Sequence, residues 1–393
     1  MKKRIEKSFV EIFGGKEDFF SVCTPGRANL IGEHIDYQGG RVMPFAIDRF
    51  IFSSGRKRND SGIRIFSFNY KDSVETSLDK ISRQEEKTWS NYLLGVIKEF
   101  RKSGFMESGV EIAFGGNIPA GSGLSSSAAL EISTASLLQK IFRTSVSPLE
   151  MIKLARRAEN EFVGVSCGIM DQFSVCLARK NRAVMINCKT LDYEYVPLFL
   201  GDNILILVNT MKERKLSSSV YNERVDSVNK ALNIIKKSVD IEFLTDLSTE
   251  QLNSFRSGIP EALFKRALHI VEENKRVIKA SCLLSEKKTD EFGQLMYQSH
   301  KSLRELYEVS CDELDFIVHF SENFEGVKGA RLTGAGMGGC CIVLIKKAAA
   351  KKYRQVLSRD YAGMFGVHPE FYSVKPVNGA FYRGKQGEKF TAC

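Results

Sequence analysis

The sequence predicts an α+β fold divided into two domains. Short apolar segments rich in β-branched residues alternate with longer segments that have the apolar spacing of helices. The helical segments are concentrated in the middle and later thirds of the chain. With 393 residues, 43% of them hydrophobic, the chain can bury one large core or two smaller ones, and two domains are the expectation for this length.

Five short segments have the composition of β-strands. They cover residues 109–114, 183–187, 203–209, 340–346 and 371–375. No internal repeat or low-complexity segment interrupts them. The strands therefore belong to mixed layers of helix and sheet.

One helix is delimited at both ends, from Ser147 to Gly164. Pro148 stands at its first position and Glu150 three residues after Ser147, as in a capping box, and Gly164 is a stop signal. Further helical patterns cover residues 220–238, 262–286 and 290–309. A domain boundary is expected near residues 190–202.

The composition excludes several classes of protein. The net charge is +10, but the basic residues are scattered and form no stripe for nucleic acid. No segment approaches the roughly 20 apolar residues that a membrane span needs. The nine cysteines lack a CxxC pair, which favours free thiols in a reducing cytoplasm, and the five histidines are too far apart in sequence to indicate a zinc site.

Residues 115–131, GGNIPAGSGLSSSAALE, are the most distinctive segment. A glycine-rich turn leads into a helix expected to start near Leu124, and backbone N–H groups at a helix N-terminus bind anions. Ser125, Ser126 and Ser127 could cap the helix, bind phosphate or ligate a Mg²⁺ carried by a nucleotide. The segment predicts a phosphate-binding loop, with a serine-capped helix as the alternative. It is not a Walker A loop, because GxxxxGK[ST] does not occur.

A second glycine-rich segment, GAGMGG at residues 334–339, matches GxGxxG. The apolar segment 340–345 that follows reads as a strand, whereas a Rossmann motif needs a helix after the glycines. The segment therefore predicts a loop that approaches a ligand or another domain, with a plain tight turn as the alternative.

The segment at residues 24–48 combines several glycines with Arg27, Glu33, His34 and Asp36. Carboxylate and imidazole groups can donate to and accept from vicinal hydroxyls. A misplaced hydroxyl would leave a buried partner unpaired, so such a site distinguishes epimers. The pattern predicts a site for a polyhydroxylated ligand, with a solvated surface loop as the alternative.

These three segments resemble the signature motifs of the GHMP small-molecule kinases. The segment at 24–48 is similar to the signature of the galactokinase family, GRxNLIGEHxDYxGG. Further similarity, in family order, lies in GIMDQF at 168–173, YNER at 221–224, SHKSLR at 299–304, YEVSC at 307–311 and ELD at 313–315.

The resemblance implies a fold and an activity. Residues 1–200 would form a domain like the second domain of ribosomal protein S5, and residues 201–375 a ferredoxin-like domain, with the active site in the cleft between them. The tail 376–393 is expected to return to the first domain. The implied reaction is phosphoryl transfer from ATP to the C1 hydroxyl of D-galactose, the first step of galactose catabolism.

The resemblance also implies cofactors and partners. Mg²⁺ would be the cofactor, with ATP as co-substrate. The expected partners are these small molecules, without nucleic acid or membrane, for a monomer in the cytoplasm.

The catalytic residues implied by the resemblance are Arg27 and Asp171. Phosphoryl transfer needs a group that orients or deprotonates the nucleophile, and this is the role expected of Asp171. Arg27 beside it would hold the carboxylate ionised. Whether Asp171 removes the proton or only orients the hydroxyl stays open at this point, and a purely structural carboxylate is the alternative.

Other site residues follow from the same resemblance. The sugar would be bound by Glu33, His34, Asp36, Gly168 and Tyr221. The nucleotide would be bound by Trp89, Gly121, Ser122, Gly123, Leu124, Ser125, Ser126 and Ser127. The magnesium ligands would be Ser127 and Glu159. An exposed glutamate is the alternative for Glu159, and core packing is the alternative for Trp89.

Two departures from the family pattern bear on the substrate. Ile35 stands where threonine is common, and Gln38 where asparagine is common. The alternative substrate is therefore N-acetylgalactosamine or another galacto-configured sugar. A catalytically silent regulator that binds galactose and ATP is a third possibility, which the complete serine loop and the presence of Arg27 and Asp171 disfavour.

Overall fold

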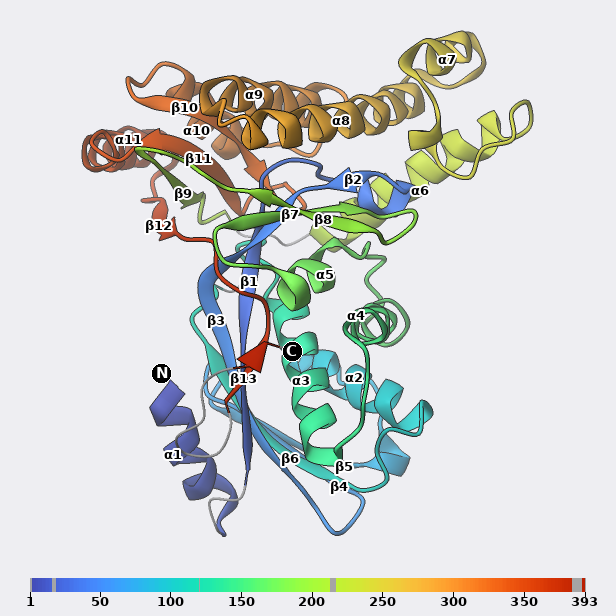
Figure 1. Cartoon of the computed structure of the whole chain (residues 1–393), viewed down its shortest axis with the longest axis vertical. Coiled ribbons are helices and arrows are strands. Elements are labelled where there is room, and N and C mark those ends of the chain that lie inside the picture. The colour runs from blue at the N-terminus through green and yellow to red at the C-terminus, as the bar shows by residue number, and fades with distance from the viewer. Residues whose placement is uncertain (1, 16–18, 120, 213–216, 384–390, 393) are drawn as a thin grey trace.

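The structure, a computed structural model, describes residues 2–15, 19–119, 121–212, 217–383 and 391–392. It is a mixed α+β fold, as the sequence predicts, with two sheet-centred halves stacked along the long axis (Figure 1).

The first half is built on a seven-stranded sheet. Helix α1 (Lys2–Phe13) packs on it through β3 and β6, and α3 (Ser126–Phe142) packs against β1 and β3 from the opposite face. In spatial order the strands are β14 (Thr391–Ala392), β13 (Phe381–Arg383), β1 (Phe20–Asn29), β3 (Pro44–Lys57), β6 (Val110–Gly116), β4 (Gly62–Ser67) and β5 (Asp72–Ser77).

Four helices cover the α3 face of this sheet (Figure 1). They are α2 (Asn91–Lys102), α3, α4 (Pro148–Arg157) and α5 (Met170–Leu177). Ser147 caps α4 by accepting a hydrogen bond from the Glu150 backbone N–H, which confirms the predicted start. The last predicted turns are a π-helix, Ala158–Val163, which ends at Gly164 in a left-handed conformation.

The segment at residues 24–48 begins and ends in strand, in β1 and β3, and a loop after β1 carries Glu33, His34 and Asp36. β1 pairs with β3 along its length, and the register shifts between Pro25 and Gly26. From Val22 to Asn29 every residue of β1 is buried, so the strand lacks the polar and apolar alternation that marks a half-exposed strand. The polar side chains in this segment therefore belong to the interior.

The second half carries a four-stranded sheet with helices packed on it. Helices α9 and α10 contact β10, and α8 lies over α9 and α6. The strands, in order, are β10 (Val327–Thr333), β11 (Cys340–Lys346), β9 (Asn203–Asn209) and β12 (Glu370–Val374). The helices are α6 (Ser217–Ile235), α7 (Thr249–Ser254), α8 (Glu261–Ser285), α9 (Thr289–Glu305), α10 (Asp312–Glu322) and α11 (Ala350–Phe365).

A small three-stranded sheet lies between the halves, where α8 contacts β2 and β8. Its strands are β2 (Arg41–Val42), β7 (Arg182–Asn187) and β8 (Tyr193–Pro197). Short 3₁₀ turns occur at Asp36–Gln38, Leu78–Lys80, Thr88–Ser90, Leu244–Asp246 and Arg256–Gly258.

After β12 the chain leaves the second half and crosses back to the first. Val377 donates its N–H to the Ala46 carbonyl at 3.0 Å, and β13 then pairs antiparallel with β1. None of the helices in the described part of the chain is both long and apolar enough to cross a membrane. The division of the chain into a first domain of residues 1–200, completed by the tail, and a second domain of residues 201–375 remains our proposal.

Candidate active site

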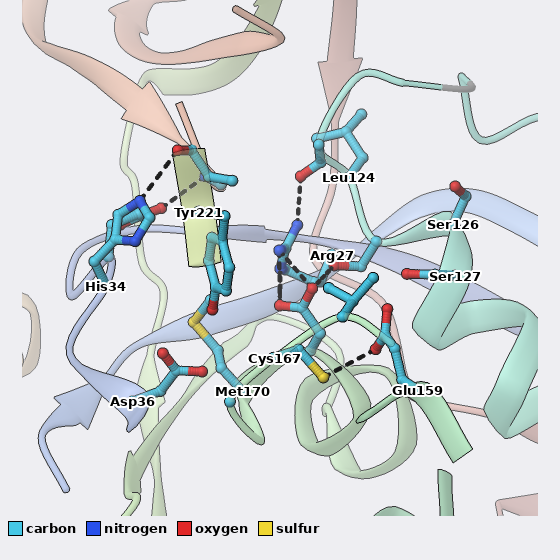
Figure 2. Close-up of a pocket in the computed structure, with 18 of the residues that line it drawn as sticks. Arg27, His34, Asp36, Leu124, Ser126, Ser127, Glu159, Cys167, Met170 and Tyr221 are labelled. Carbon is cyan, nitrogen blue, oxygen red and sulfur yellow. Dashed lines mark hydrogen bonds and ion pairs between the residues drawn. The ribbon is translucent and has the colours of Figure 1, made fainter. Parts of the chain in front are cut away.

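A cavity of about 410 Å³ opens where the two halves meet. The serine loop, the loop after β1, the segment before α5, helix α6 and the glycine loop before β11 all contribute to it (Figure 2). Segments far apart in the sequence therefore converge on one pocket.

Most of the predicted site residues line this cavity. They are Arg27, Glu33, His34, Asp36, Gly121, Gly123, Leu124, Ser125, Ser126, Ser127, Glu159, Gly168, Asp171 and Tyr221.

Trp89 and Ser122 are the predicted residues that do not line the cavity. Ser122 donates its hydroxyl to the Pro119 carbonyl at 2.7 Å, so it shapes the loop. Trp89 is buried and stacks on Tyr70, with ring centroids 5.7 Å apart. The aromatic residue of this region that reaches the cavity is Tyr92, three residues further along.

Arg27 and Asp171 form a two-pronged ion pair. The Nε and Nη2 atoms of Arg27 donate to Oδ1 and Oδ2 of Asp171, each at 2.8 Å. Nη1 of Arg27 donates to the Gly123 carbonyl at 2.6 Å, which ties the pair to the serine loop. Arg27 is only 4% exposed, and such a buried fork holds both side chains in one orientation.

Ser125 has a position that the sequence did not reveal. It precedes α3 with a φ of 55°, in the left-handed region, and does not cap the helix with its side chain. Instead its hydroxyl donates to Oδ2 of Asp171. The strained backbone thus directs this hydroxyl to the carboxylate, as strained residues at functional sites often do.

The two ring nitrogens of His34 already have partners in the protein. Nε2 lies 3.1 Å from the Ala335 carbonyl, which can only accept, so Nε2 carries the proton. Nδ1 then accepts from the Tyr37 hydroxyl at 2.9 Å, and Tyr37 accepts in turn from Tyr307 at 2.6 Å. Burial lowers the pKa of His34 to about 3, so the ring is neutral. His34 therefore shapes the pocket and has no ring nitrogen left over for a sugar hydroxyl.

Glu33 is buried and joins the loop after β1 to the second half. Oε2 accepts from Arg331 and from Asn29, the latter at 2.8 Å, and Oε1 accepts from the Gly334 N–H at 3.0 Å. Burial raises the pKa of Glu33, although Arg331 acts in the opposite direction. These bonds place Glu33 at the cavity wall.

Asp36 and Gly168 lie in direct contact. A Cβ atom on Gly168 would lie 1.7 Å from Oδ2 of Asp36, so this position accepts no side chain. Burial, followed by the nearby charge of Asp171, raises the pKa of Asp36 to about 6. The carboxyl group lies below Tyr221 in the view of Figure 2.

Tyr221 reaches the cavity from helix α6. Its ring lies 5.4 Å from His34 and 5.8 Å from Tyr37. Burial raises the pKa of Tyr221 well above its usual value, so the phenol stays neutral and can donate a hydrogen bond.

Ser127, in the first turn of α3, and Glu159 lie side by side at the cavity wall (Figure 2). Glu159 is 6% exposed, which rules out the exposed alternative. A hydroxyl and a carboxylate provide oxygen donors, the kind Mg²⁺ prefers, and Mg²⁺ usually takes one or two protein ligands besides phosphates and water. The described residues contain no cluster of three His, Cys, Asp or Glu side chains that could hold a metal ion.

Several residues near the cavity were missed from the sequence. Gln172 donates through Nε2 to Glu159 at 2.6 Å and to Glu131 at 3.0 Å, and Glu131 is fully buried with Oε1 unpartnered among the described residues. Burial raises the pKa of Glu131 well above its usual value. Both residues lie inside segments that the sequence analysis singled out, Glu131 at the end of 115–131 and Gln172 in GIMDQF at 168–173, which is the signal that could have identified them.

The glycine loop before β11 packs directly against the serine loop. A Cβ atom on Gly334 would lie 2.9 Å from the Gly123 carbonyl. This confirms that the loop approaches another part of the chain closely, and Gly334 and Ala335 also line the cavity.

Family models match this chain in three regions. The GHMP kinases N terminal domain matches residues 91–179, and the GHMP kinases C terminal domain matches residues 280–363. The galactokinase galactose-binding signature matches residues 7–57.

Known proteins resemble the chain along nearly its whole length. A galactokinase from Clostridium tetani is 43% identical, covering 96% of each chain. One from Bacillus subtilis is 42% identical, covering 97% of this chain and 98% of its own. The crystal structure of Lactococcus lactis galactokinase complexed with galactose superposes with a TM-score of 0.93 at 36% identity, covering 96% of this chain and 98% of the other.

More distant structures share the fold. The mevalonate kinase of Methanococcus jannaschii has a TM-score of 0.67 at 21% identity, covering 93% of this chain. The two GHMP kinase family models, together with this fold and cavity, define a small-molecule kinase of the GHMP class. Within that class, the identity along the full length shows that the chain belongs to the galactokinase family.

Proposed function

We propose that the protein transfers the γ-phosphoryl group of ATP to the C1 hydroxyl of D-galactose, producing galactose 1-phosphate and ADP. The observation that carries this proposal is the Arg27–Asp171 fork, which lies in one cavity with the serine loop on one side and Asp36 and Tyr221 on the other.

In this mechanism Asp171 accepts a hydrogen bond from the C1 hydroxyl. As the new O–P bond forms, the hydroxyl proton passes to the carboxylate. Arg27 orients the Asp171 carboxylate through its two hydrogen bonds, and its charge also stabilises the negative charge that develops on the transferred group. The Ser125 hydroxyl donates to Oδ2 of Asp171, so the protein fixes the orientation of the carboxylate toward the cavity.

The phosphates of ATP would lie on the serine loop and the N-terminus of α3. Backbone N–H groups there and the hydroxyls of Ser126 and Ser127 provide donors for phosphate oxygens. Ser127 and Glu159 would hold Mg²⁺, which neutralises phosphate charge when bound. Tyr92 lies at the cavity wall near this end, and Trp89 would support the nucleotide region from behind.

The two departures from the family pattern lie away from the cavity. Ile35 is completely buried and contacts Gly40. Gln38 donates to Asn229 at 2.8 Å and packs in the interior. Neither side chain lines the sugar pocket, so the structure supplies no reason to prefer N-acetylgalactosamine over galactose.

The test is an ADP-release assay with Mg-ATP and galactose, N-acetylgalactosamine, glucose or mevalonate. Turnover with galactose, with a ³¹P signal for an anomeric phosphate, is the expected result. Turnover with N-acetylgalactosamine instead would overturn the assignment of substrate. Binding of galactose and ATP without turnover would indicate a regulator.

Replacing Tyr221 by phenylalanine is expected to raise KM for galactose about 3- to 10-fold, with a smaller change in kcat. The ring packing against His34 and Tyr37 is kept, and one hydrogen bond to the sugar is lost, worth about 1 kcal/mol. Steady-state kinetics measures the effect. The matched control is Tyr193→Phe, at an exposed tyrosine outside the cavity, and an unchanged KM in the Tyr221 variant would place this hydroxyl outside the sugar site.

The kcat/KM for galactose is expected to fall as the pH drops below about 6. Asp36 accepts sugar hydroxyls best when ionised, and its raised pKa of about 6 means that the ionised form is lost as the pH falls through that value. The charged and titratable groups that act on it or are acted on by it include Asp171, Arg156, Tyr221, Tyr37, Tyr307 and Cys188. A profile of kcat/KM against pH at saturating Mg-ATP checks this. If the fall in kcat/KM at low pH persists unchanged in Asp36→Asn, another group causes it.

We also propose Mg²⁺ as the cofactor and a monomer in the cytoplasm as the working form. The pair formed by Ser127 and Glu159 supports the first point. The cytoplasm follows from the substrates, which are small molecules of the cell interior, and the monomer follows from the family resemblance. Sedimentation of the protein with and without substrates would test the monomer.

A further inference from the structure

A second cavity, of about 520 Å³, lies directly behind the sugar pocket and shares Asp36 with it. Helix α4 and the π-helical turn after it form one wall. The turn between β7 and β8 forms another, and Tyr37 and Phe243 close the remaining side. No step of the proposed reaction uses this space.

Four cationic side chains line the second cavity, and two of them already have carboxylate partners. Arg157 pairs with Glu99 at 2.9 Å. Lys189 pairs with Asp246 at 2.9 Å. Their charges are therefore largely compensated.

The other two cations, Lys153 and Arg156, form no ion pair with a carboxylate among the residues that the structure describes. They lie three residues apart on α4, so they project from the same side of the helix. Arg156 donates from Nε to the Cys167 carbonyl at 3.3 Å, and the described residues provide no hydrogen-bond partner for its two Nη groups. Two cations without an ion-pair partner among the described residues thus line one half-open cavity, the exposed Lys153 at its surface and the partly buried Arg156 closer to Asp36.

The rest of the lining suits a small molecule with a polar and an apolar side. Ile169, Leu191 and Phe243 provide apolar surface, and Asp36 provides an acceptor for hydroxyl groups at the base. Glu161 is exposed and carries the opposing charge on this lining. The volume lies within the range of small-molecule pockets and exceeds what a bare anion needs.

We propose that this second cavity binds a sugar phosphate, with the phosphoryl group on Lys153 and Arg156 and the sugar hydroxyls toward Asp36. Guanidinium and ammonium groups are the usual partners of phosphate in proteins. The product of the proposed reaction belongs to this chemical class, and to that extent the proposal rests on the proposed function.

The two cavities are coupled through Asp36. The positive charge of Arg156 acts on this carboxyl group and lowers its pKa, against burial and Asp171, which raise it. A phosphoryl group bound to Arg156 would cancel part of that positive charge. The ionised form of Asp36 would then be less favourable relative to the protonated form. Sugar phosphate in the second cavity would thereby raise KM for galactose without occupying the sugar pocket.

Calorimetry tests the proposal when the sugar pocket is filled with galactose and a non-hydrolysable ATP analogue. Galactose 1-phosphate and inorganic phosphate are then titrated separately into the wild type, into Lys153→Gln/Arg156→Gln, and into Lys351→Gln/Lys352→Gln. The last variant is a matched control that removes two exposed lysines from α11, which does not line the cavity. Circular dichroism confirms that all three are folded.

Saturable binding of galactose 1-phosphate to the wild type and the control, weakened at least tenfold in Lys153→Gln/Arg156→Gln, is the expected result. Equally tight binding of inorganic phosphate would overturn the sugar part of the proposal. No saturable binding, or binding unchanged in the double variant, would overturn the site. The calorimetry measures binding and needs no turnover. Failure of this proposal can therefore be told apart from failure of the proposed function, which the kinase assay tests.

Discussion

Replacing Asp171 by asparagine is expected to lower kcat by roughly 10²- to 10⁴-fold, the usual contribution of a general base. The amide keeps the shape of the side chain but accepts no proton. Galactose affinity is expected to change only a few-fold, because Asp36 and Tyr221 are untouched. Single-turnover kinetics and calorimetry with galactose measure the two quantities separately.

Ser125→Ala is the control for this variant. It removes one hydrogen bond to Asp171 and leaves the fork from Arg27 in place. We therefore expect kcat to fall by less than about tenfold, which corresponds to the loss of one modest hydrogen bond. If Asp171→Asn were as mild as Ser125→Ala, Asp171 would be an orienting group and not the proton acceptor.

Replacing Arg331 by methionine is expected to lower the free energy of unfolding by about 3–5 kcal/mol, the cost of leaving a buried charge without its partner. Arg331 is completely buried and Glu33 is 1% exposed. In the variant the Glu33 carboxylate keeps the Asn29 and Gly334 donors but loses the cation. The midpoint of urea unfolding, measured by circular dichroism, reports the loss.

The double variant Glu33→Gln/Arg331→Met separates lost charge from lost packing. Because it buries no charge, it should recover most of the stability that Arg331→Met loses. The deficit of the single variant should also shrink as the pH falls, since burial raises the pKa of Glu33 and the protonated form is neutral. A double variant as unstable as the single one would show that Arg331 acts through packing.

Local signals in the sequence were sufficient for several elements. Ser147, Pro148 and Gly164 marked the ends of one helix, and the runs at 203–209 and 340–346 coincide with β9 and β11. These elements are determined by caps and by apolar runs, which are properties of neighbouring residues. The site motifs were likewise visible because each is continuous along the chain.

What the sequence could not reveal depends on distant partners. β1 reads as a polar loop because its buried Arg27 finds Asp171 only in the fold, 144 positions away. Nothing in the sequence around Arg331 indicated a buried ion pair, since its partner Glu33 lies in the first half of the fold. His34 looked like a sugar ligand until Tyr37 and Ala335 accounted for both ring nitrogens.

The return of the chain to the first sheet has a consequence for synthesis on the ribosome. β1 ends at Asn29, whereas its neighbour β13 begins at Phe381. While the intervening residues are being made, residues 21–23 of β1, which pair with β13 in the finished fold, have β3 on one side and an open edge on the other. Unpaired edges template contacts with other chains, so nascent and truncated forms of this protein should need shielding at that edge until β13 arrives.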